Sequence, residues 1–204
     1  MNEQELLYTI ALTRVLPYQS QVQQTLLDTM GSATALATAG TALHDAFPQI
    51  TERLERHIAQ IPEHLARAEQ EIEFARKNHI RIIHRDDADY PARLRECSDA
   101  PILLYYRGSV DLNSRRILSI VGTRKASEYG RTFCQRFLTD LARLCPDVLV
   151  ISGLAYGIDI CAHRQSLSNG LSTIGVLAHG LDQIYPRMHR QTAIEMLTQG
   201  GLLT

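Results

Sequence analysis

Three polar, glycine-bearing segments in the second half of the chain hold the residue types best suited to chemistry: residues 122–130, 152–159 and 179–187. Each follows a short apolar run and precedes a helical pattern, so each is predicted to be a loop at the carboxyl end of a strand. Backbone N–H groups at the start of a helix attract anions, and a glycine lets a phosphate approach the backbone closely. The segments therefore predict a phosphate-binding edge; the alternative is that their glycines only close tight turns.

The first two loops supply small and cationic residues of the kind that bind phosphate. Arg124 and Lys125 would add positive charge where the backbone amides already point. A tyrosine in each of the three loops could stack on bases or could pack its loop against the sheet. The candidate binding residues are Gly122, Thr123, Arg124, Lys125, Ser152 and Gly153, and the tyrosines are Tyr129, Tyr156 and Tyr185.

Two side chains near the start of one predicted helix could also ligate a metal. Asp159 and His163 are four residues apart and so share a face of that helix. A structural role is favoured, in which Asp159 complements the helix dipole while His163 hydrogen-bonds it and fixes the loop. His179 and His189 are expected on the solvent side of their loops. Neither a metal nor a cofactor is expected.

Several signatures of enzymes and nucleotide-binding proteins are missing from the sequence. The first loop lacks GxGxxG, and the second strand ends in Ser152 where a dinucleotide-binding protein would have Asp or Glu. GxxxxGK[ST] and GxSxG are also absent, and no cysteine stands in a loop beside a histidine as an activated nucleophile would. The sequence therefore favours a binding protein over an enzyme.

The elements that must position these loops alternate regularly from residue 116 onward. Apolar runs of strand length alternate with helical patterns, which predicts right-handed βαβ units and a parallel sheet with helices on both faces. In such sheets ligands bind beyond the carboxyl ends of the strands. Another strand is expected to begin after residue 199, so the C-terminus is expected to be truncated. The predicted strands are 117–121, 148–151 and 173–178, and the predicted helices are about 128–144, 158–167 and 190–198.

The first 78 residues have a different pattern. Apolar residues at helical spacing, interrupted by glycine and proline, predict a small all-helical domain that ends in a connecting helix at 62–78. The predicted fold is therefore α/β: a small all-α domain at 1–78, followed by a Rossmann-like domain at 79–204. The remaining helices are predicted at 2–16, 20–30, 32–38, 41–46 and 50–59, and two short strands at 80–84 and 102–106.

Composition and charge narrow the class of protein. The chain has 204 residues, of which 45% are hydrophobic and 21% are charged. This composition excludes a disordered protein, and this length is enough to bury a stable core without disulfides. No window is apolar enough for a membrane span, no leading segment resembles a signal peptide, and four separated cysteines suit a reducing cytoplasm. Residues 1–78 carry 6 Lys and Arg against 10 Asp and Glu, whereas residues 79–204 carry 15 against 12. The second part is the candidate for an anionic ligand.

The motifs of this second part resemble those of the DNA-processing protein A (DprA/Smf) family. The resemblance covers most of residues 80–204. It lies in SIVGTR (119–124) with SEYG (127–130), SGLAYGID (152–159) with AH (162–163), and TIGVL (173–177) with GLD (180–182) and YP (185–186). Weaker echoes occur in YPARL (90–94), PILLY (101–105) and RG (107–108).

The resemblance implies an extended Rossmann-like domain that binds single-stranded DNA, forms a homodimer and loads the recombinase RecA during natural transformation. It implies that Gly122, Thr123 and Arg124 hold a DNA phosphate, with Arg124 as the principal cation. Arg187 stands where the family usually has Lys after Tyr-Pro, so the charge is retained and a bidentate contact is available. His189 stands where the family usually has Asn. On this reading the protein protects incoming DNA in the cytoplasm and is not an enzyme.

The N-terminal part fits the family's helical domain, which is sterile-alpha-motif-like or helix-hairpin-helix-like, only in outline. A DNA-binding hairpin would have a Gly-x-Gly turn near residue 17, where this sequence reads Leu16-Pro17-Tyr18-Gln19-Ser20. Six basic against ten acidic residues also give this part a net charge of −4. It is therefore predicted to be a protein-contact or regulatory module.

Two other functions stay open. A related Rossmann-like enzyme, a phosphoribohydrolase of nucleoside monophosphates, would use the same phosphate loops, but its PGGxGTxxE motif is absent here. The chain could also serve only as a dimerising or RecA-docking surface. Protection against heat by AMP rather than by oligo-dT would distinguish the enzyme from the DNA-binding protein.

Overall fold

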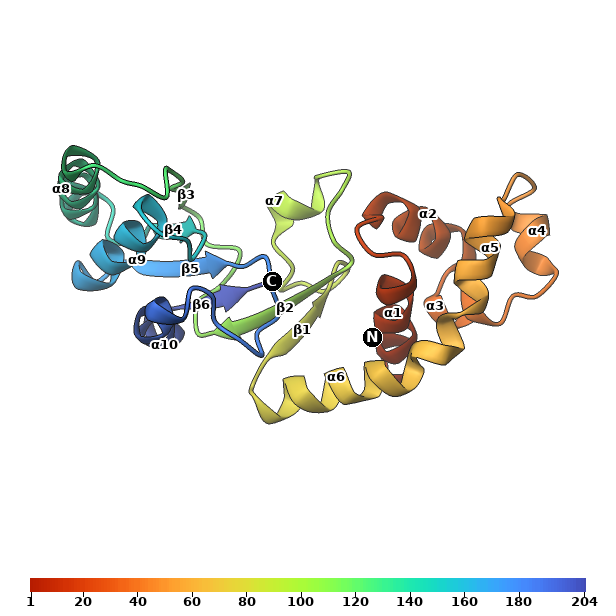
Figure 1. Ribbon diagram of the computed structural model, residues 1–204. Coiled ribbons are helices and arrows are strands. Elements are labelled where there is room, and N and C mark those ends of the chain that lie inside the picture. The colour runs from red at the N-terminus through yellow and green to blue at the C-terminus, as the bar shows by residue number, and fades with distance from the viewer. The chain divides into compact units, whose positions relative to one another are not determined.

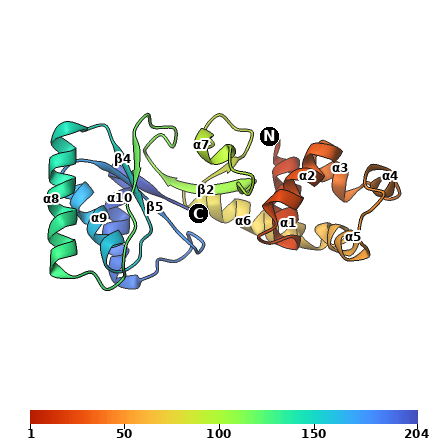
Figure 2. The same cartoon turned by 90° about the horizontal axis from the view of Figure 1, so that it is seen from above.

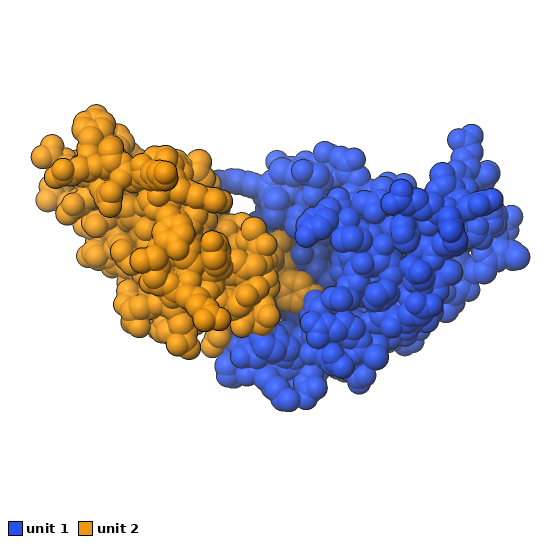
Figure 3. Space-filling model, in the orientation of Figure 1, with its two compact units in different colours: residues 1–103 blue, residues 104–204 orange.

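The computed structural model describes residues 1–204 and contains two compact units, residues 1–103 and residues 104–204 (Figure 3). Helices alone occupy the first part of the chain and strands alternate with helices in the last part, which confirms the predicted α/β class. The predicted domain boundary at residue 78 stays a prediction. None of the helices combines the length and the apolar character that crossing a bilayer would require.

Unit 1 begins with short helices joined by tight turns (Figure 1). The side chains of Asn2, Ser32 and Thr51 each accept a hydrogen bond from the backbone N–H three residues on, which fixes where three of the helices begin. Gly31 ends one helix in the left-handed conformation, at φ 78°. The elements are α1 (Glu3–Val15), α2 (Ser20–Met30), α3 (Ala33–Ala37), α4 (Ala42–Ala46), α5 (Glu52–Ala59), the 3₁₀ helix η1 (Ile61–His64) and α6 (Leu65–Lys77). These bounds confirm the predicted helices to within a few residues.

The rest of unit 1 holds the strand β1 (Arg81–His84) and the one-turn helix α7 (Ala92–Arg95). Tyr90 lies between these two elements in the sequence and its side chain is fully buried. Its hydroxyl donates to the carbonyl of Pro101 at 2.6 Å. Burial raises the pKa of Tyr90 to about 12. The tyrosine of the first Tyr-Pro motif is therefore a core residue of this unit.

Unit 2 contains a sheet in which the strands follow the order β2-β6-β5-β4-β3. Val150 lies opposite Leu118 on one side and Thr173 on the other, so the register of the parallel strands is continuous across the sheet. Strand β2 is antiparallel to its neighbour β6, which the sequence did not predict. The strands are β2 (Leu103–Gly108), β3 (Ile117–Ser119), β4 (Leu149–Ser152), β5 (Ser172–Val176) and β6 (Gly200–Leu203). The last of these confirms the strand predicted after residue 199.

Three helices, α8 (Glu128–Leu144), α9 (Ile158–Ser168) and α10 (Arg190–Gln199), form one layer against this sheet (Figure 2). The prediction that helices cover both faces is wrong for these three, because α9 packs between α8 and α10. The physical reason is topological: the parallel strands advance in one direction, and right-handed crossovers then place every helix on the same face. Leu138, Val150 and Ala162 lie in the buried core between this layer and the sheet.

Candidate functional site

The first two glycine loops meet at the carboxyl edge of the sheet, as predicted. They follow β3 and β4, which are parallel neighbours, and lead into α8 and α9. The backbone N–H of Ile158, the first residue of α9, donates to the carbonyl of Thr123 at 3.2 Å. The start of α9 is therefore held directly by the first loop.

Two glycines are needed for this close approach. Gly157 has φ 83°, and a Cβ there would collide with the carbonyl of Thr123. A Cβ on Gly122 would lie 2.7 Å from the side chain of Ile158. Both glycines therefore have a packing role at the junction of the loops, and the phosphate-binding role of Gly122 stays a prediction.

The predicted cations of the first loop are accessible. Arg124 and Lys125 are exposed, as are Gly122 and Thr123 beside them. Neither cation forms an ion pair with a carboxylate. Arg187 is also exposed and unpaired, at the start of the 3₁₀ helix η2 (Arg187–His189) in the third loop. These side chains are free to receive an anion.

The second loop offers less to an anion than the sequence suggested. Ser152 is buried, and its hydroxyl donates to the carbonyl of Ile120 at 2.6 Å. Gly153 is half-buried, and the place of its missing Cβ is 2.6 Å from a carboxylate oxygen of Asp159. A phosphate at this point would face a negative charge. The roles of Ser152 and Gly153 stay predictions.

His163 does not hydrogen-bond Asp159, so that prediction is wrong. Its Nε2 lies 2.6 Å from the carbonyl oxygen of Gly153, and its Nδ1 lies 2.7 Å from Oγ1 of Thr173. The imidazole is fully buried against the sheet, whereas the carboxylate turns toward the second loop. Burial lowers the pKa of His163 to about 4. His163 therefore joins α9 to β5 and to the loop after β4, and no group of three potential metal ligands surrounds it.

The prediction that His189 lies on the solvent side is also wrong. Its side chain is 2% exposed, and Nδ1 lies 2.7 Å from the carbonyl oxygen of Leu154. The ring of Tyr156 meets its imidazole edge to face, with centroids 5.2 Å apart. His179 is half-buried, and its Nε2 accepts from the N–H of Tyr185 at 3.3 Å. His179 holds the backbone of its own loop and His189 holds that of the second loop, which sequence spacing alone could not reveal.

The tyrosines of the three loops are exposed: Tyr129, Tyr156 and Tyr185. Their rings are accessible, so base stacking stays a prediction for all three. Tyr156 is the one that the structure also fixes in place, through its contact with His189.

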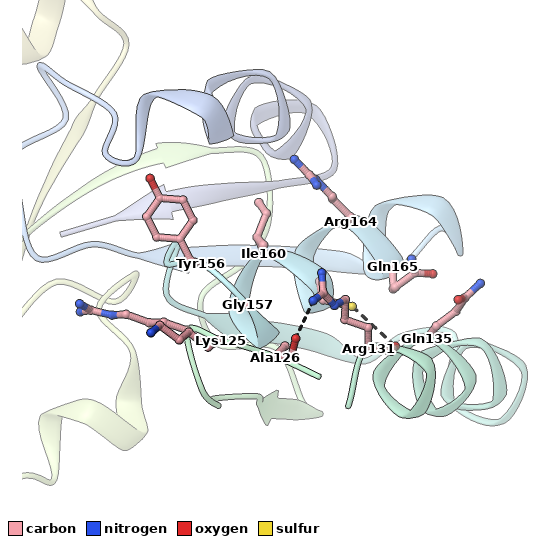
Figure 4. A pocket seen from close by; sticks show the side chains of 11 residues that line it. Lys125, Ala126, Arg131, Gln135, Tyr156, Gly157, Ile160, Arg164 and Gln165 are labelled. Carbon is pink, nitrogen blue, oxygen red and sulfur yellow. Dashed lines mark hydrogen bonds between the residues drawn. The ribbon is translucent and has the colours of Figure 1, made fainter. Parts of the chain in front are cut away.

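A pocket of about 710 Å³ adjoins the first loop and extends between α8 and α9 (Figure 4). Arg124 and Lys125 line it, together with Tyr156. Arg131 of α8 and Arg164 of α9 also line it, and neither was predicted from the sequence. Their spacing within their own helices gives no signal, because the pocket forms only when α8 and α9 pack side by side.

The two overlooked arginines are held by neutral groups. Nη2 of Arg131 donates to the carbonyl of Ala126 at 2.6 Å, as Figure 4 shows, and Nε of Arg164 donates to Oγ1 of Thr192 at 3.3 Å. Neither guanidinium has a carboxylate partner. A concave site with several unpaired cations is suited to a phosphate-bearing ligand.

Fold and site together define an α/β protein of the Rossmann-like class with a cationic site at the carboxyl edge of its sheet. The model of the family described as DNA recombination-mediator protein A matches residues 81–204, which is more than half of the chain. The chain belongs to this family. The match covers all three glycine-bearing loops, the cations in them and the helices that line the pocket.

Curated relatives share this part of the chain. The DNA processing protein DprA of Streptococcus pneumoniae (strain ATCC BAA-255 / R6) is 38% identical over 105 residues, which are 52% of this chain and 36% of that protein. Protein Smf of Escherichia coli (strain K12) is 39% identical over 123 residues, which are 60% of this chain and 32% of that protein. This chain therefore matches about a third of the length of these relatives.

Solved structures show the same fold. The X-ray structure of DprA from Streptococcus pneumoniae superposes with a TM-score of 0.70 at 24% identity, covering 97% of this chain and 66% of that one. A structure that concerns the single-stranded DNA binding mode of DprA from Helicobacter pylori gives a TM-score of 0.50 at 24% identity, covering 61% of this chain and 54% of that one.

Proposed function

We propose that this protein binds single-stranded DNA at the carboxyl edge of its sheet without reading the base sequence. The observation that carries the proposal is the pair Arg124 and Lys125, which are exposed and free of carboxylate partners. They directly follow Thr123, where the first loop contacts the start of α9. Gly122, Thr123 and Arg124 would hold one phosphate, and Arg187 would add a weaker contact from the third loop.

The physics of phosphate binding supports this function. Phosphates carry no base information, so cations that contact them give affinity without sequence preference. Each contact also releases counterions, so the affinity falls steeply as salt rises. The Helicobacter pylori relative is described by its single-stranded DNA binding mode, and that description agrees in kind with the chemistry of the present site.

Titration of labelled oligo-dT at two ionic strengths tests the proposal. Arg124→Gln is expected to weaken binding severalfold and to lessen the salt dependence, and Arg187→Gln is expected to do so less. Arg143→Gln is the matched control, because Arg143 lies on α8 with its guanidinium 3.7 Å from Asp140. Unchanged affinity of Arg124→Gln and Arg187→Gln in the folded protein would refute the assignment of the site.

The wider role that we propose is that of a non-catalytic recombination mediator. A homodimer would protect incoming single strands and load RecA onto them in natural transformation. Gel filtration tests the dimer, and capture of purified RecA by the DNA-bound protein tests the partner. Thermal protection by AMP in the absence of protection by oligo-dT would favour the phosphoribohydrolase instead.

A further inference from the structure

The pocket beside the first loop continues well beyond the residues of the proposed DNA site. Figure 4 shows its side chains running from Lys125 at one end to Gln135 and Gln165 at the other, with Arg131 between them. Arg131 and Gln135 are four residues apart on α8, so they share a face of that helix. Arg164 and Gln165 line the opposite wall on α9. The two helices thus form a groove that starts at the first loop.

We infer that this groove is a second phosphate-binding position for the same DNA strand, formed by Arg131 and Arg164. The inference rests on the proposed function, because it extends the strand from the loop site defined by Arg124 and Lys125. Those two residues line both the loop edge and the groove, so one strand can extend from the first position to the second along a surface that stays positively charged.

The guanidinium groups of the groove are oriented but not neutralised. Each arginine has five N–H donors, and the structure uses one of Arg131 on the Ala126 carbonyl and one of Arg164 on the Thr192 hydroxyl. Both partners are neutral, so the full positive charge faces the groove. Arg116 of unit 2, by contrast, lies against a carboxylate, with its Nη1 2.6 Å from Oδ1 of Asp147. A fixed guanidinium loses less freedom on binding than a mobile one, and two of its N–H groups can contact one phosphate.

The remaining lining suits a nucleic acid strand rather than a bare ion. A volume of about 710 Å³ has room for more than a single phosphate. The amides of Gln135 and Gln165 can donate to and accept from sugars or bases, and Ile160 and Tyr156 add apolar surface. No carboxylate side chain lines the groove. This set of groups binds backbone and base surface without selecting a sequence.

The test compares Arg164→Gln with Arg136→Gln in the full chain. Arg136 is an exposed arginine of α8 outside the groove and without a carboxylate partner, so its variant removes the same charge at a place where no DNA contact is proposed. Arg164→Gln is preferred over a change at Arg131, whose guanidinium also supports the first loop. Binding is measured over a salt series with oligo-dT of about 4 and about 20 nucleotides, which bracket typical single-strand site sizes.

For the long oligonucleotide, Arg164→Gln is expected to weaken binding severalfold and to reduce the slope of log K against log salt by about 0.7, the value of one phosphate contact on a single strand. Arg164→Gln is expected to bind the short oligonucleotide, which the loop site alone can hold, with an affinity within about twofold of wild type. Arg136→Gln is expected to leave the slope of log K against log salt unchanged for both oligonucleotides.

Three outcomes would overturn the inference. If Arg164→Gln matches Arg136→Gln while Arg124→Gln weakens binding, the groove is not a DNA site and the proposed function stands. If Arg164→Gln weakens the short and the long oligonucleotide equally, the groove is not a separate position along the strand. If neither Arg124→Gln nor Arg164→Gln changes binding, both the inference and the proposed function fail.

Discussion

Acidification from pH 7 to pH 5 is expected to destabilise the protein through His163. The ring is fully buried, and the carbonyl of Gly153 at 2.6 Å can only accept, so Nε2 carries the proton of the neutral imidazole. Nδ1 then accepts from the Thr173 hydroxyl at 2.7 Å. A second proton would put a charge in the core and force that hydroxyl to turn to the Val150 carbonyl, 3.0 Å away. Burial accordingly lowers the pKa of His163 from 6.5 to about 4.

The sign and size of the effect follow from proton uptake. Between pH 6.5 and pH 4 the unfolded chain binds a proton at His163 that the folded chain does not, so the free energy of unfolding falls as the pH falls. The contribution is complete above pH 6.5 and is lost progressively toward pH 4. At about 1.36 kcal/mol per pKa unit, the full loss is about 3 kcal/mol, and about 2 kcal/mol of it is lost by pH 5.

Urea denaturation at several pH values measures this loss. A His163→Gln variant is expected to be less stable than wild type at pH 7, because it leaves buried hydrogen-bonding partners unsatisfied. The gap between the two proteins should narrow by about 2 kcal/mol on going to pH 5. A gap that stays constant with pH would refute the reasoning. So would an NMR titration in which the His163 imidazole takes up its proton above pH 6, and that measurement does not depend on the variant folding.

Three further predictions concern local packing. Gly157→Ala should lower the free energy of unfolding by about 1–3 kcal/mol more than Gly170→Ala, because both glycines have positive φ but only Gly157 has a carbonyl where the Cβ would go; equal losses in urea denaturation would contradict the proposed contact. Tyr90→Phe should cost about 1 kcal/mol, because a buried carbonyl loses its donor; a neutral change, or absorbance showing phenolate formation at Tyr90 near pH 10, would contradict this. Burial raises the pKa of Cys134 to about 12 while Cys97 is exposed, so a thiol reagent at neutral pH should label Cys97 first and Cys134 last; mass spectrometry showing the reverse order would exclude the packing described.

The sequence predicted the elements of unit 2 well because their boundaries are set locally. Helix α8 begins directly after Ser127, whose side chain accepts a hydrogen bond from the Gly130 N–H. The helix ends at Leu144, where the helical spacing of apolar residues also ends. The meeting of the first two loops also followed from local patterns, since parallel neighbours must present their carboxyl ends at one edge. Whether helices cover one face or both depends on the direction in which strands are added, which no local pattern encodes.

The parts of the site that the sequence did not predict depend on contacts between distant residues. His163 and Asp159 share a helix face, yet the histidine hydrogen-bonds Thr173 of β5 and lies against the Gly153 carbonyl, while the carboxylate of Asp159 faces Gly153. Arg131 and Arg164 are 33 positions apart and converge only through the packing of α8 on α9. A list of loop residues could therefore find the edge of the site but not the groove that continues from it.

The arrangement of charge also explains why side chains rather than helix dipoles must hold an anion here. The N–H of Ile158 at the start of α9 is already bonded to the Thr123 carbonyl, and the carboxylate of Asp159 in the same turn offsets the positive end of the helix. What remains positive at this edge comes from Arg124 and Lys125 and, along the groove, from Arg131 and Arg164. Side-chain cations on a solvated surface bind the phosphates of a polyanion with release of its counterions, so a site of this kind favours a long polyanion over a single small nucleotide. If the backbone N–H groups at the start of the helix were free to bind a phosphate, a single nucleotide would be favoured instead.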